Sequence, residues 1–424
     1  MQFPLPAFMS VSAENPWTYL VFGLIGFAFG FTLEMSGFGD SRKLAAQFYF
    51  TEMTVLKVMF TAIVTAMVLL FGAVSLGLLN FNLVWVNETY LASGILGGLI
   101  MGVGFIVGGF CPTTSLASAS TGKIDGMFFM LGGFFGALLF GETEKYFDYW
   151  YTHAGYFGRL TLDQVFGLPV GVVVLLVVFM ALFMFWGAEQ LERIFGKKDL
   201  TKEPKLRLAG AGLLAVAAIS VALIGTPSTN AKYDRLTFER EVDGQKVQYT
   251  ADEMLAERKV QIHPGELLAT MADDRLIASV IDVRSEADYN LFHIANSVNV
   301  PLTEIKTVVP SLLADQAANK VYVVVSNDEV AATEAWKILA AEAAPNVYIL
   351  EGGINNWIAV FGENEDGIRL LTVSSADVLR YAFNSALGDR YECANPSPLA
   401  EWELDFTPKI QLQLKRDKSG GGCG

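Results

Sequence analysis

The chain has 424 residues, of which 52% are hydrophobic and only 17% are charged, whereas a soluble domain carries roughly 25% charged residues. Its net charge of -14 argues against nucleic acid as a partner. The three cysteines, Cys111, Cys393 and Cys423, are too few and too scattered for a disulfide framework or a zinc site of recognisable spacing. We therefore expect neither a bound metal nor another cofactor.

Hydropathy divides the chain near residue 227. Before this point there are several runs of about 20 apolar residues, the length that crosses about 30 Å of hydrocarbon. After it, short apolar runs alternate with charges, as in a soluble α/β domain. The predicted parts are a membrane domain (1–227), a linker (228–261), an α/β domain (262–362) and a C-terminal extension (363–424). Six membrane crossings are predicted, at 17–36, 56–79, 92–110, 126–140, 169–186 and 208–226.

Lysine and arginine in the short loops predict the orientation, because loops rich in these residues face the cytoplasm. Residues 80–90 contain neither, whereas residues 192–207 contain six. The segment 192–207 is therefore predicted to face the cytoplasm. The protein itself is predicted to lie in the cell inner membrane. With six crossings, the residues after 226 then face the periplasm or the cell exterior.

Residues 104–121 are predicted to form a helix that breaks inside the membrane. A glycine-rich apolar stretch leads into Cys111 and Pro112, and proline lacks an N–H and disfavours helical geometry in the residue before it. The hydroxyls of Thr113 and Thr114 are suitable N-caps for a short second helix. Because lipid cannot satisfy free backbone N–H groups at such a break, we expect a polar ligand there. Cys111, Pro112, Thr113 and Thr114 are candidate substrate-binding residues.

The same pattern occurs 72 residues earlier in the chain, where the Gly-Phe pair 37–38 corresponds to the pair 109–110. Gly39 stands where the second copy has its cysteine, and Asp40 and Ser41 follow with N-capping side chains. Paired broken helices that direct their N-termini at one site are a transporter device for binding anions. Gly39, Asp40 and Ser41 therefore join the candidate substrate-binding residues. The alternative is that the glycines only allow close helix packing.

Cys111 allows two interpretations. Beside a helix N-terminus the pKa of a thiol falls and its sulfur contacts another sulfur atom more readily, or Cys111 is simply a small apolar residue in a crowded bundle. Glu34 lies near the end of an apolar segment, where an acid is costly. An ion pair with Arg42, Lys43 or Lys57 would explain Glu34. Lys57 either extends to the membrane interface or helps to draw an anion inward, and it is included among the candidate substrate-binding residues.

Three motifs of the first half are F-G-F-T-L-E-M-S-G-F-G-D-S-R-K-L-A, V-L-K-V-M-F-T-A and G-F-I-V-G-G-F-C-P-T-T-S. Over residues 20–142 they resemble the YeeE/YedE family of sulfur-compound transporters. The resemblance implies a membrane permease for thiosulfate or a related sulfur species, with pore cysteines that contact the substrate sulfur. Cys111 matches such a position. Gly39 departs from the pattern where relatives with several pore cysteines carry one, so a relay of thiols is in doubt.

In the second half, strands and helices alternate, which predicts a parallel sheet. Apolar strands are expected at 278–283, 321–325 and 347–350, and a helix at 331–344. Ligands of such sheets bind beyond the carboxyl ends of the strands. The loop after the second strand is therefore a candidate functional loop, made of Ser326, Asn327, Asp328 and Glu329.

The motifs D-V-R-S-E-A-D-Y, F-H-I-A-N-S-V-N-V-P and E-G-G-I-N-N-W appear in this order and resemble a rhodanese domain over residues 262–362. Rhodaneses carry a cysteine nucleophile directly after the central strand, and the matching residue here is Ser326. A hydroxyl of ordinary pKa cannot take up a sulfane sulfur, so we expect no sulfurtransferase turnover. The loop N–H groups could still bind an anion, and a purely structural domain is the alternative. Asp282, Arg284 and His293 are expected to hold the fold.

The extension ends in the glycine-rich segment K-S-G-G-G-C-G, which places Cys423 on a flexible arm. Such a thiol can carry a persulfide or form a disulfide with Cys393, so Cys423 and Cys393 are candidate sulfur carriers. The alternatives for Cys423 are a tolerated terminal cysteine and a sequence added for expression. Residues 371–386 are predicted to be helical.

We therefore expect a polytopic α-helical membrane domain, with an internal repeat and broken or re-entrant helices, joined to a soluble α/β rhodanese-like domain. The expected function is uptake of a sulfur anion, thiosulfate by resemblance, in a transporter rather than an enzyme, with an outward-facing domain that binds or delivers the substrate. The alternative is a membrane-anchored sulfur carrier or sulfurtransferase that uses Cys423 or Cys393. The expected partners are the sulfur anion, membrane lipid and a sulfur-carrier protein.

Overall fold

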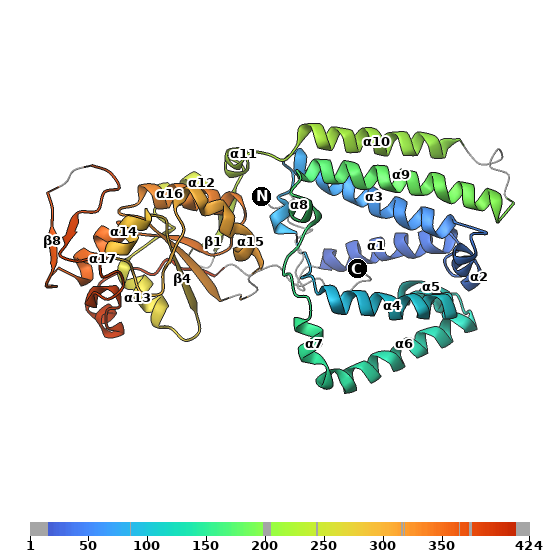
Figure 1. The fold of residues 1–424 in the computed structure, drawn as a ribbon, viewed down its shortest axis with the longest axis horizontal. Coiled ribbons are helices and arrows are strands. Elements are labelled where there is room, and N and C mark those ends of the chain that lie inside the picture. Colours follow the sequence, from blue (N-terminus) through green and yellow to red (C-terminus); the bar gives the residue numbers. More distant parts are fainter. Residues whose placement is uncertain are drawn as a thin grey trace. The chain divides into compact units, whose positions relative to one another are not determined.

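The computed structural model describes residues 16–84, 86–197, 205–242, 245–314, 317, 319–363, 365–372 and 375–412. The chain divides into two compact units, whose helices and strands are drawn in Figure 1. Apart from the chain ends, the membrane unit comprises Gln2–Leu79 and Val86–Thr226, and the soluble unit comprises Asn80–Trp85 and Pro227–Asp417. The short loop that begins at Asn80 thus folds with the soluble unit.

The described part of the membrane unit is helical. Its α-helices are α1 (Pro16–Met35), α2 (Ser41–Ala46), α3 (Thr54–Ser75), α4 (Leu91–Gly108), α5 (Pro112–Ser120), α6 (Ile124–Thr143), α7 (Asp148–His153), α8 (Leu162–Phe166), α9 (Val170–Ile194) and α10 (Leu206–Ile224). Five stretches of the described residues are long and apolar enough to cross a membrane: α3, α4 with α5, α6, α9 and α10. They coincide with five of the six predicted crossings. The first predicted crossing falls on α1, whose apolar stretch Tyr19–Met35 is shorter.

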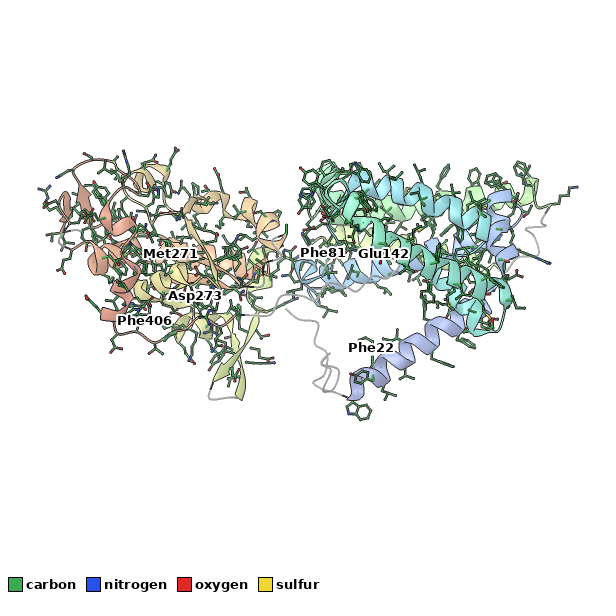
Figure 2. All side chains as sticks on the ribbon, turned by 90° about the horizontal axis from the view of Figure 1, so that it is seen from below. Phe22, Phe81, Glu142, Met271, Asp273 and Phe406 are labelled. Atoms are coloured by element: carbon green, nitrogen blue, oxygen red, sulfur yellow. The ribbon has the colours of Figure 1, made fainter. Side chains whose placement is uncertain are left out.

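The membrane unit carries apolar side chains on its outside and polar side chains in its interior. Val107 and Leu223 are more than 80% exposed, and Phe22, labelled in Figure 2, is 55% exposed. By contrast, Ser118 and Glu192 are fully buried. Water would penalise this arrangement, but lipid matches it, because polar groups within a membrane face the bundle interior. The observed polarity therefore supports a multi-pass membrane protein.

The soluble unit contains a five-stranded parallel sheet in the order β3-β7-β6-β4-β5. Its strands are β3 (Gln261–Ile262), β4 (Ile277–Asp282), β5 (Val298–Asn299), β6 (Lys320–Val325) and β7 (Val347–Leu350). All residues of the central strand β6 after Lys320 are buried, which explains why its sequence is a continuous apolar run rather than an alternating one. The three strands predicted from the sequence are confirmed as β4, β6 and β7.

Helices and irregular turns surround this sheet. They are α13 (Pro264–Ala272), α14 (Glu286–Leu291), η6 (Leu302–Val308), α15 (Val309–Ala314), α16 (Val330–Ala341), α17 (Gly353–Phe361), η7 (Glu392–Ala394) and η8 (Pro398–Glu403). Trp336 on α16 and Trp357 on α17 are among the largest fully buried side chains. The predicted helix at 331–344 is confirmed as α16. Since α16 begins directly after the candidate loop, its first turn presents backbone N–H groups to that loop.

Two expectations for the soluble unit need correction. Residues 228–261, expected to be a linker, contain α11 (Thr229–Tyr233), the antiparallel hairpin of β1 (Thr237–Val242) and β2 (Gln245–Thr250), and α12 (Ala251–Ala256). Met254 from this segment is buried in the core of the unit, so the segment is part of the fold.

The helix predicted at 371–386 is wrong. Instead, β9 (Tyr381–Phe383) pairs with β8 (Ile368–Leu370), and the Leu371 N–H donates to Arg380 O. Contacts with distant parts of the unit thus override the local helical pattern, as tertiary context often does. The glycine-rich arm with Cys423 lies outside the described residues.

Candidate functional site

Two helix breaks in the membrane unit have the same construction. After α1, Gly37 adopts φ +77° and Phe38 is buried; after α4, Gly109 adopts φ +71° and Phe110 is buried. A positive φ is readily accessible to glycine, which ends each helix in the left-handed conformation. These pairs are the ones matched by the 72-residue offset, so the predicted internal repeat with broken helices is confirmed.

The two breaks lie against each other. A Cβ atom on Gly109 would lie 3.0 Å from both Cβ and O of Ser41, so the glycine lets the second break approach the first. Lys123 Nζ donates to Gly39 O at 2.9 Å, and Ser41 Oγ donates to Asp125 Oδ2 at 3.0 Å. Gly39 and Ser41, two candidate residues of the first repeat, therefore contact residues of the second repeat.

Lys123 and Asp125 were missed in the sequence, although they are the charged residues that follow the short helix α5 in an otherwise apolar region. Asp40 Oδ1 accepts from the Arg42 N–H at 3.0 Å and caps α2 as predicted. Glu34 Oε2 lies 2.8 Å, and Lys123 Nζ 3.0 Å, from where a Cβ on Gly39 would stand. The absent side chain of Gly39 thus leaves room for a carboxylate and an ammonium group.

Cys111 occupies the N-cap position of α5 and is half-buried. The Cys111 N–H donates to Thr114 Oγ1 at 2.9 Å, and the Thr114 hydroxyl lies 3.1 Å from Cys111 O and 3.3 Å from Cys111 Sγ. Pro112 is the first helical residue, where its missing N–H is harmless. Thr113, also half-buried, follows in the same turn. The four predicted residues therefore form one polar turn at the start of α5.

The buried face of α5 is lined by hydroxyl groups. Thr114, Ser115 and Ser118 are buried, whereas Leu116 on another side of the helix is 53% exposed. In the described part of the chain, the Ser118 hydroxyl has no hydrogen-bond partner. It packs against Gly126 of α6, where a Cβ would lie 2.5 Å from Ser118 Oγ. A polar strip thus runs from Cys111 along the interior side of α5.

Lys57 has a different role from the one expected. Its Nζ lies 2.6 Å from Glu192 Oε2, and Glu192 Oε1 accepts the Met53 N–H at 2.6 Å. Glu192 is fully buried on α9, where an unpaired carboxylate would be very unfavourable. Lys57 is therefore the counter-ion of Glu192 and links α3 to α9, which favours a structural role over a substrate-binding one.

In the soluble unit, the candidate loop begins at Ser326, which is fully buried at the end of β6. Ser326 Oγ accepts the N–H of Ala332 at 3.2 Å. Asp328 Oδ1 accepts the N–H groups of Glu329 and Val330. The first turn of α16 is therefore already capped by side chains of the loop itself.

A carboxylate from the C-terminal extension accepts two further N–H groups at this loop. Asp377 Oδ1 accepts the N–H of Asp328 at 2.9 Å, and Asp377 Oδ2 accepts the N–H of Ala331 at 2.8 Å. In return, the Asp377 N–H donates to Asp328 Oδ2 at 2.6 Å. In this state the N–H groups of residues 328–331 are not available to an external anion, contrary to the expectation from the sequence. Nothing local in the sequence around Asp377 signals this contact.

The electrostatics of Asp328 follow from these contacts. Burial raises the pKa of the Asp328 carboxyl, but hydrogen bonds from the N–H groups of Val330, Asp377 and Glu329 outweigh burial and hold the pKa below its usual value. An ionised carboxylate that accepts several N–H groups is stabilised in this way.

The side chains of Glu329 and Asn327 form hydrogen bonds with other parts of the domain. Both oxygens of Glu329 accept from Arg258, and Glu329 Oε1 also accepts the Gly352 N–H at 2.7 Å. Asn327 Nδ2 donates to Asp377 O at 3.1 Å, while its Oδ1 lies 3.4 Å from Arg284 Nη1. These side chains position the loop rather than opening a binding site.

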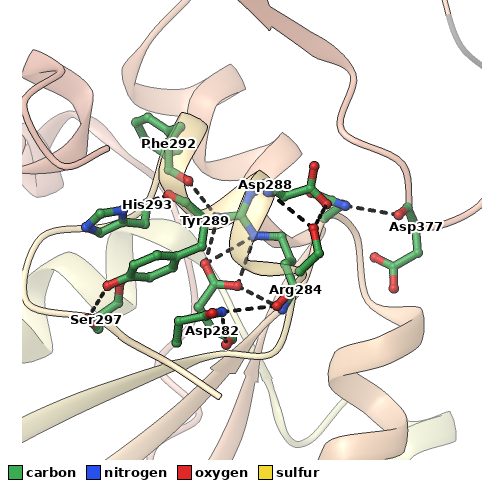
Figure 3. A network of polar contacts seen from close by, with 11 residues as sticks. Asp282, Arg284, Asp288, Tyr289, Phe292, His293, Ser297 and Asp377 are labelled. Atoms are coloured by element: carbon green, nitrogen blue, oxygen red, sulfur yellow. Dashed lines mark hydrogen bonds and ion pairs between the residues drawn. The ribbon is translucent and has the colours of Figure 1, made fainter. Parts of the chain in front are cut away.

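Arg284 forms a buried ion pair with Asp282, at 2.6 Å between Nη2 and Oδ2, and also donates to Phe292 O (Figure 3). His293 stacks on Tyr289 and its Nδ1 lies 2.8 Å from Tyr289 O. The arrangement fits the structural role expected for Asp282, Arg284 and His293.

Cys393, which is part of the extension, is buried, and its N–H donates to Glu365 Oε2 at 2.9 Å. Burial, together with the nearby Glu365 carboxylate, raises the pKa of the Cys393 thiol well above its usual value. A thiol acts as a nucleophile or sulfur carrier through its thiolate form, so the environment of Cys393 opposes the role of sulfur carrier. Among the described residues, no group of three or more His, Cys, Asp or Glu side chains could hold a metal ion.

Comparison with protein families places these sites in context. The family described as sulphur transport matches residues 35–239, and the rhodanese-like domain matches residues 263–360. No curated protein and no solved structure matches the chain. The chain therefore joins a membrane region that matches the sulphur transport (YeeE/YedE) family model to a C-terminal region that matches the rhodanese-like domain.

Proposed function

We propose that the protein takes up thiosulfate, or a sulfur anion of similar shape, through the place where the two helix breaks meet. The family match and the apolar membrane helices support the broader function, which is transport of a sulfur compound by a multi-pass membrane protein. The finer proposal concerns the substrate, the residues that contact it and the direction of transport.

The meeting of the two breaks carries the proposal. It brings Gly39 and Ser41 of the first break to Lys123 and to Gly109, which lies two residues before Cys111. The thiol of Cys111 and the hydroxyl of Thr114 lie 3.3 Å apart at the start of α5. Thiosulfate combines a soft terminal sulfur with hard oxygens. The Cys111 sulfur can contact the terminal sulfur of thiosulfate. The hydroxyls, the N-terminal end of α5 and Lys123 can bind its oxygens.

The polar strip on α5 suits an anion that has to leave water. Thr114, Ser115 and Ser118 present hydroxyls in the interior, where each can donate a hydrogen bond to an oxyanion. The Ser118 hydroxyl, which has no partner in the described part of the protein, would gain one from a passing anion. Hydroxyls bind less strongly than fixed positive charges, which favours passage over trapping.

The soluble unit is proposed to lie on the periplasmic side of an inner membrane. Within that unit, Asn80 Nδ2 donates to Ala341 O and Asn82 Nδ2 donates to Glu342 Oε2, each at 2.9 Å. The loop after α3 and the rhodanese-like domain therefore share one side. This loop lacks Lys and Arg, whereas the segment before α10 is rich in both, which favours a periplasmic domain.

Orientation can be tested with an impermeant thiol reagent on intact cells. Asp274→Cys lies on an exposed turn of the soluble unit, and Lys197→Cys replaces an exposed residue shortly after the end of α9. We expect the first to be labelled and the second to be protected. The reverse pattern would place the rhodanese-like domain in the cytoplasm.

The rhodanese-like domain is proposed to deliver the anion without chemical turnover. Ser326 stands at the position expected for the nucleophile, and its hydroxyl is buried and accepts the Ala332 N–H. A hydroxyl is a weak nucleophile at its ordinary pKa and does not take up sulfane sulfur as a thiolate does. Delivery requires the loop to exchange its internal carboxylate, Asp377, for the anion.

The central experiment is uptake of labelled thiosulfate into proteoliposomes that contain the purified chain. Cys111→Ala is expected to lower uptake at least about tenfold, as expected for loss of one well-placed contact worth about 1.4 kcal/mol. Ser120→Ala, an exposed position on the same short helix, serves as the matched control and should transport normally. Excess unlabelled sulfate, sulfite and selenite, added separately, define the anion preference.

The same assay distinguishes the alternative of a membrane-anchored sulfur carrier. In that case uptake would survive Cys111→Ala, and Cys423→Ala would abolish transfer of sulfur to an acceptor thiol. Wild-type uptake by the Cys111→Ala variant would therefore refute the proposed site.

A further inference from the structure

The extension residues 375–380, which we call the strap, pass over the candidate loop of the rhodanese-like domain. Asp377 in the strap and Asp328 in the loop exchange contacts: the N–H of each donates to the carboxylate of the other. The second oxygen of Asp377 accepts the N–H of Ala331 in the first turn of α16. Asp377 thus binds the loop as a bidentate oxyanion would.

Further contacts hold the strap at Asp377 and in the three residues that follow it. Its carbonyl accepts from Asn327 Nδ2 at 3.1 Å, and Asn355 on α17 donates to Val378 O and accepts the Arg380 N–H. Leu379 is buried in the core of the unit. These contacts come from the loop after β6 and from helix α17, so the strap is packed against two separate parts of the domain.

The backbone of Asp377 is held in an uncommon conformation. Its φ is +54°, which non-glycine residues adopt rarely, although aspartate tolerates it better than most. In this conformation the N–H and the carboxylate of Asp377 both face the loop and are both used. The local conformation is unfavourable on its own and is maintained by the contacts with the loop.

We propose that the strap is an autoinhibitory element that closes an oxyanion site on the rhodanese-like loop, with Asp377 as the internal ligand. The site takes a small oxyanion such as thiosulfate on the N–H groups of Asp328 and Ala331 only after Asp377 leaves. The ligand chemistry follows from the contacts themselves, since any replacement must accept the same two N–H groups. This inference rests on the proposed delivery role of the domain and adds a closed state of the loop, in which Asp377 prevents the anion from binding.

Hydrogen–deuterium exchange of the loop peptide in the purified full chain tests the proposal. In Asp377→Ala, the amides of Asp328 and Ala331 lose their acceptors and should exchange at least about tenfold faster. Thiosulfate should restore protection in this variant and leave the wild type unchanged, because only the variant has an open site. Sodium chloride at equal ionic strength should have no effect on either protein.

Two further variants serve as controls for non-specific effects and for misfolding. Asp366→Ala removes an exposed carboxylate from the same extension and should leave loop exchange unchanged. Asp377→Asn keeps one acceptor oxygen and should give intermediate exchange, which is informative if the alanine variant does not fold. Protection of the wild-type loop by thiosulfate, or no thiosulfate response in both Asp377 variants, would overturn the proposal. Loop exchange is measured without transport, so this inference and the uptake site can fail independently.

Discussion

Gly109 is where a single added methyl group should separate the two helix breaks. Its φ of +71° lies in the left-handed region, where an L-residue pays about 1–2 kcal/mol. The new Cβ would also stand 3.0 Å from Ser41 O, a backbone atom that cannot rotate away. A displacement of α5 relative to Ser41 should follow. The conformational term alone corresponds to a factor of about 5–30 in an equilibrium.

We therefore expect Gly109→Ala to lower thiosulfate uptake in proteoliposomes at least about fivefold, with a lower thermal unfolding temperature in detergent. The matched control is Gly104→Ala on the same helix, where no heavy atom lies within 4 Å of the added Cβ. That variant should transport normally, because alanine favours a helix interior. Equal uptake by the two variants would show that the close contact between the breaks does not matter for transport.

Two more predictions concern the soluble unit. Asp282→Ala leaves Arg284 buried without its counter-ion, which should destabilise the unit by about 3–5 kcal/mol. Asp273→Ala should cost much less, because its partner Arg275 is 87% exposed and can be hydrated when the carboxylate is removed. Guanidinium unfolding measures both, and equal effects would contradict the structural role of the buried pair. The depressed pKa of Asp328 means that its stabilisation of the strap is complete above the ordinary carboxyl value of 3.8 and is lost as pH falls below it. Relative to the intrinsic exchange rate at each pH, the protection of the loop amides should therefore fall on acidification in the wild type. An unchanged acid response in Asp328→Asn would exclude this carboxyl as the cause.

Much of the architecture can be predicted from local patterns. Apolar runs of membrane length predict the crossing helices, and the Gly-Phe pairs followed by Pro112 or Asp40 predict the two breaks. These features depend on backbone conformation within a few neighbouring residues, so they are visible in the sequence. The order of three rhodanese motifs likewise predicts the sheet, its central strand and the helix that follows.

Contacts between side chains that are distant in the chain cannot be predicted from local sequence patterns. Lys57 and Glu192 are 135 residues apart in the chain and 2.6 Å apart in space. From the sequence, Lys57 could have faced lipid headgroups, an anion or Glu34. A buried carboxylate from α9 decides between these roles, because leaving Glu192 unpaired in the interior would be costly.

The rhodanese-like loop illustrates the same division. That Ser326 follows the central strand, and that the loop lacks a nucleophilic thiol, can be read directly from residue order. That the loop is closed depends on Asp377, 49 residues beyond Asp328, in a segment whose local pattern predicts a helix. Residue identity and short-range spacing define which groups are present. Only folding brings a distant carboxylate onto the loop N–H groups, since such contacts depend on the path of the whole chain.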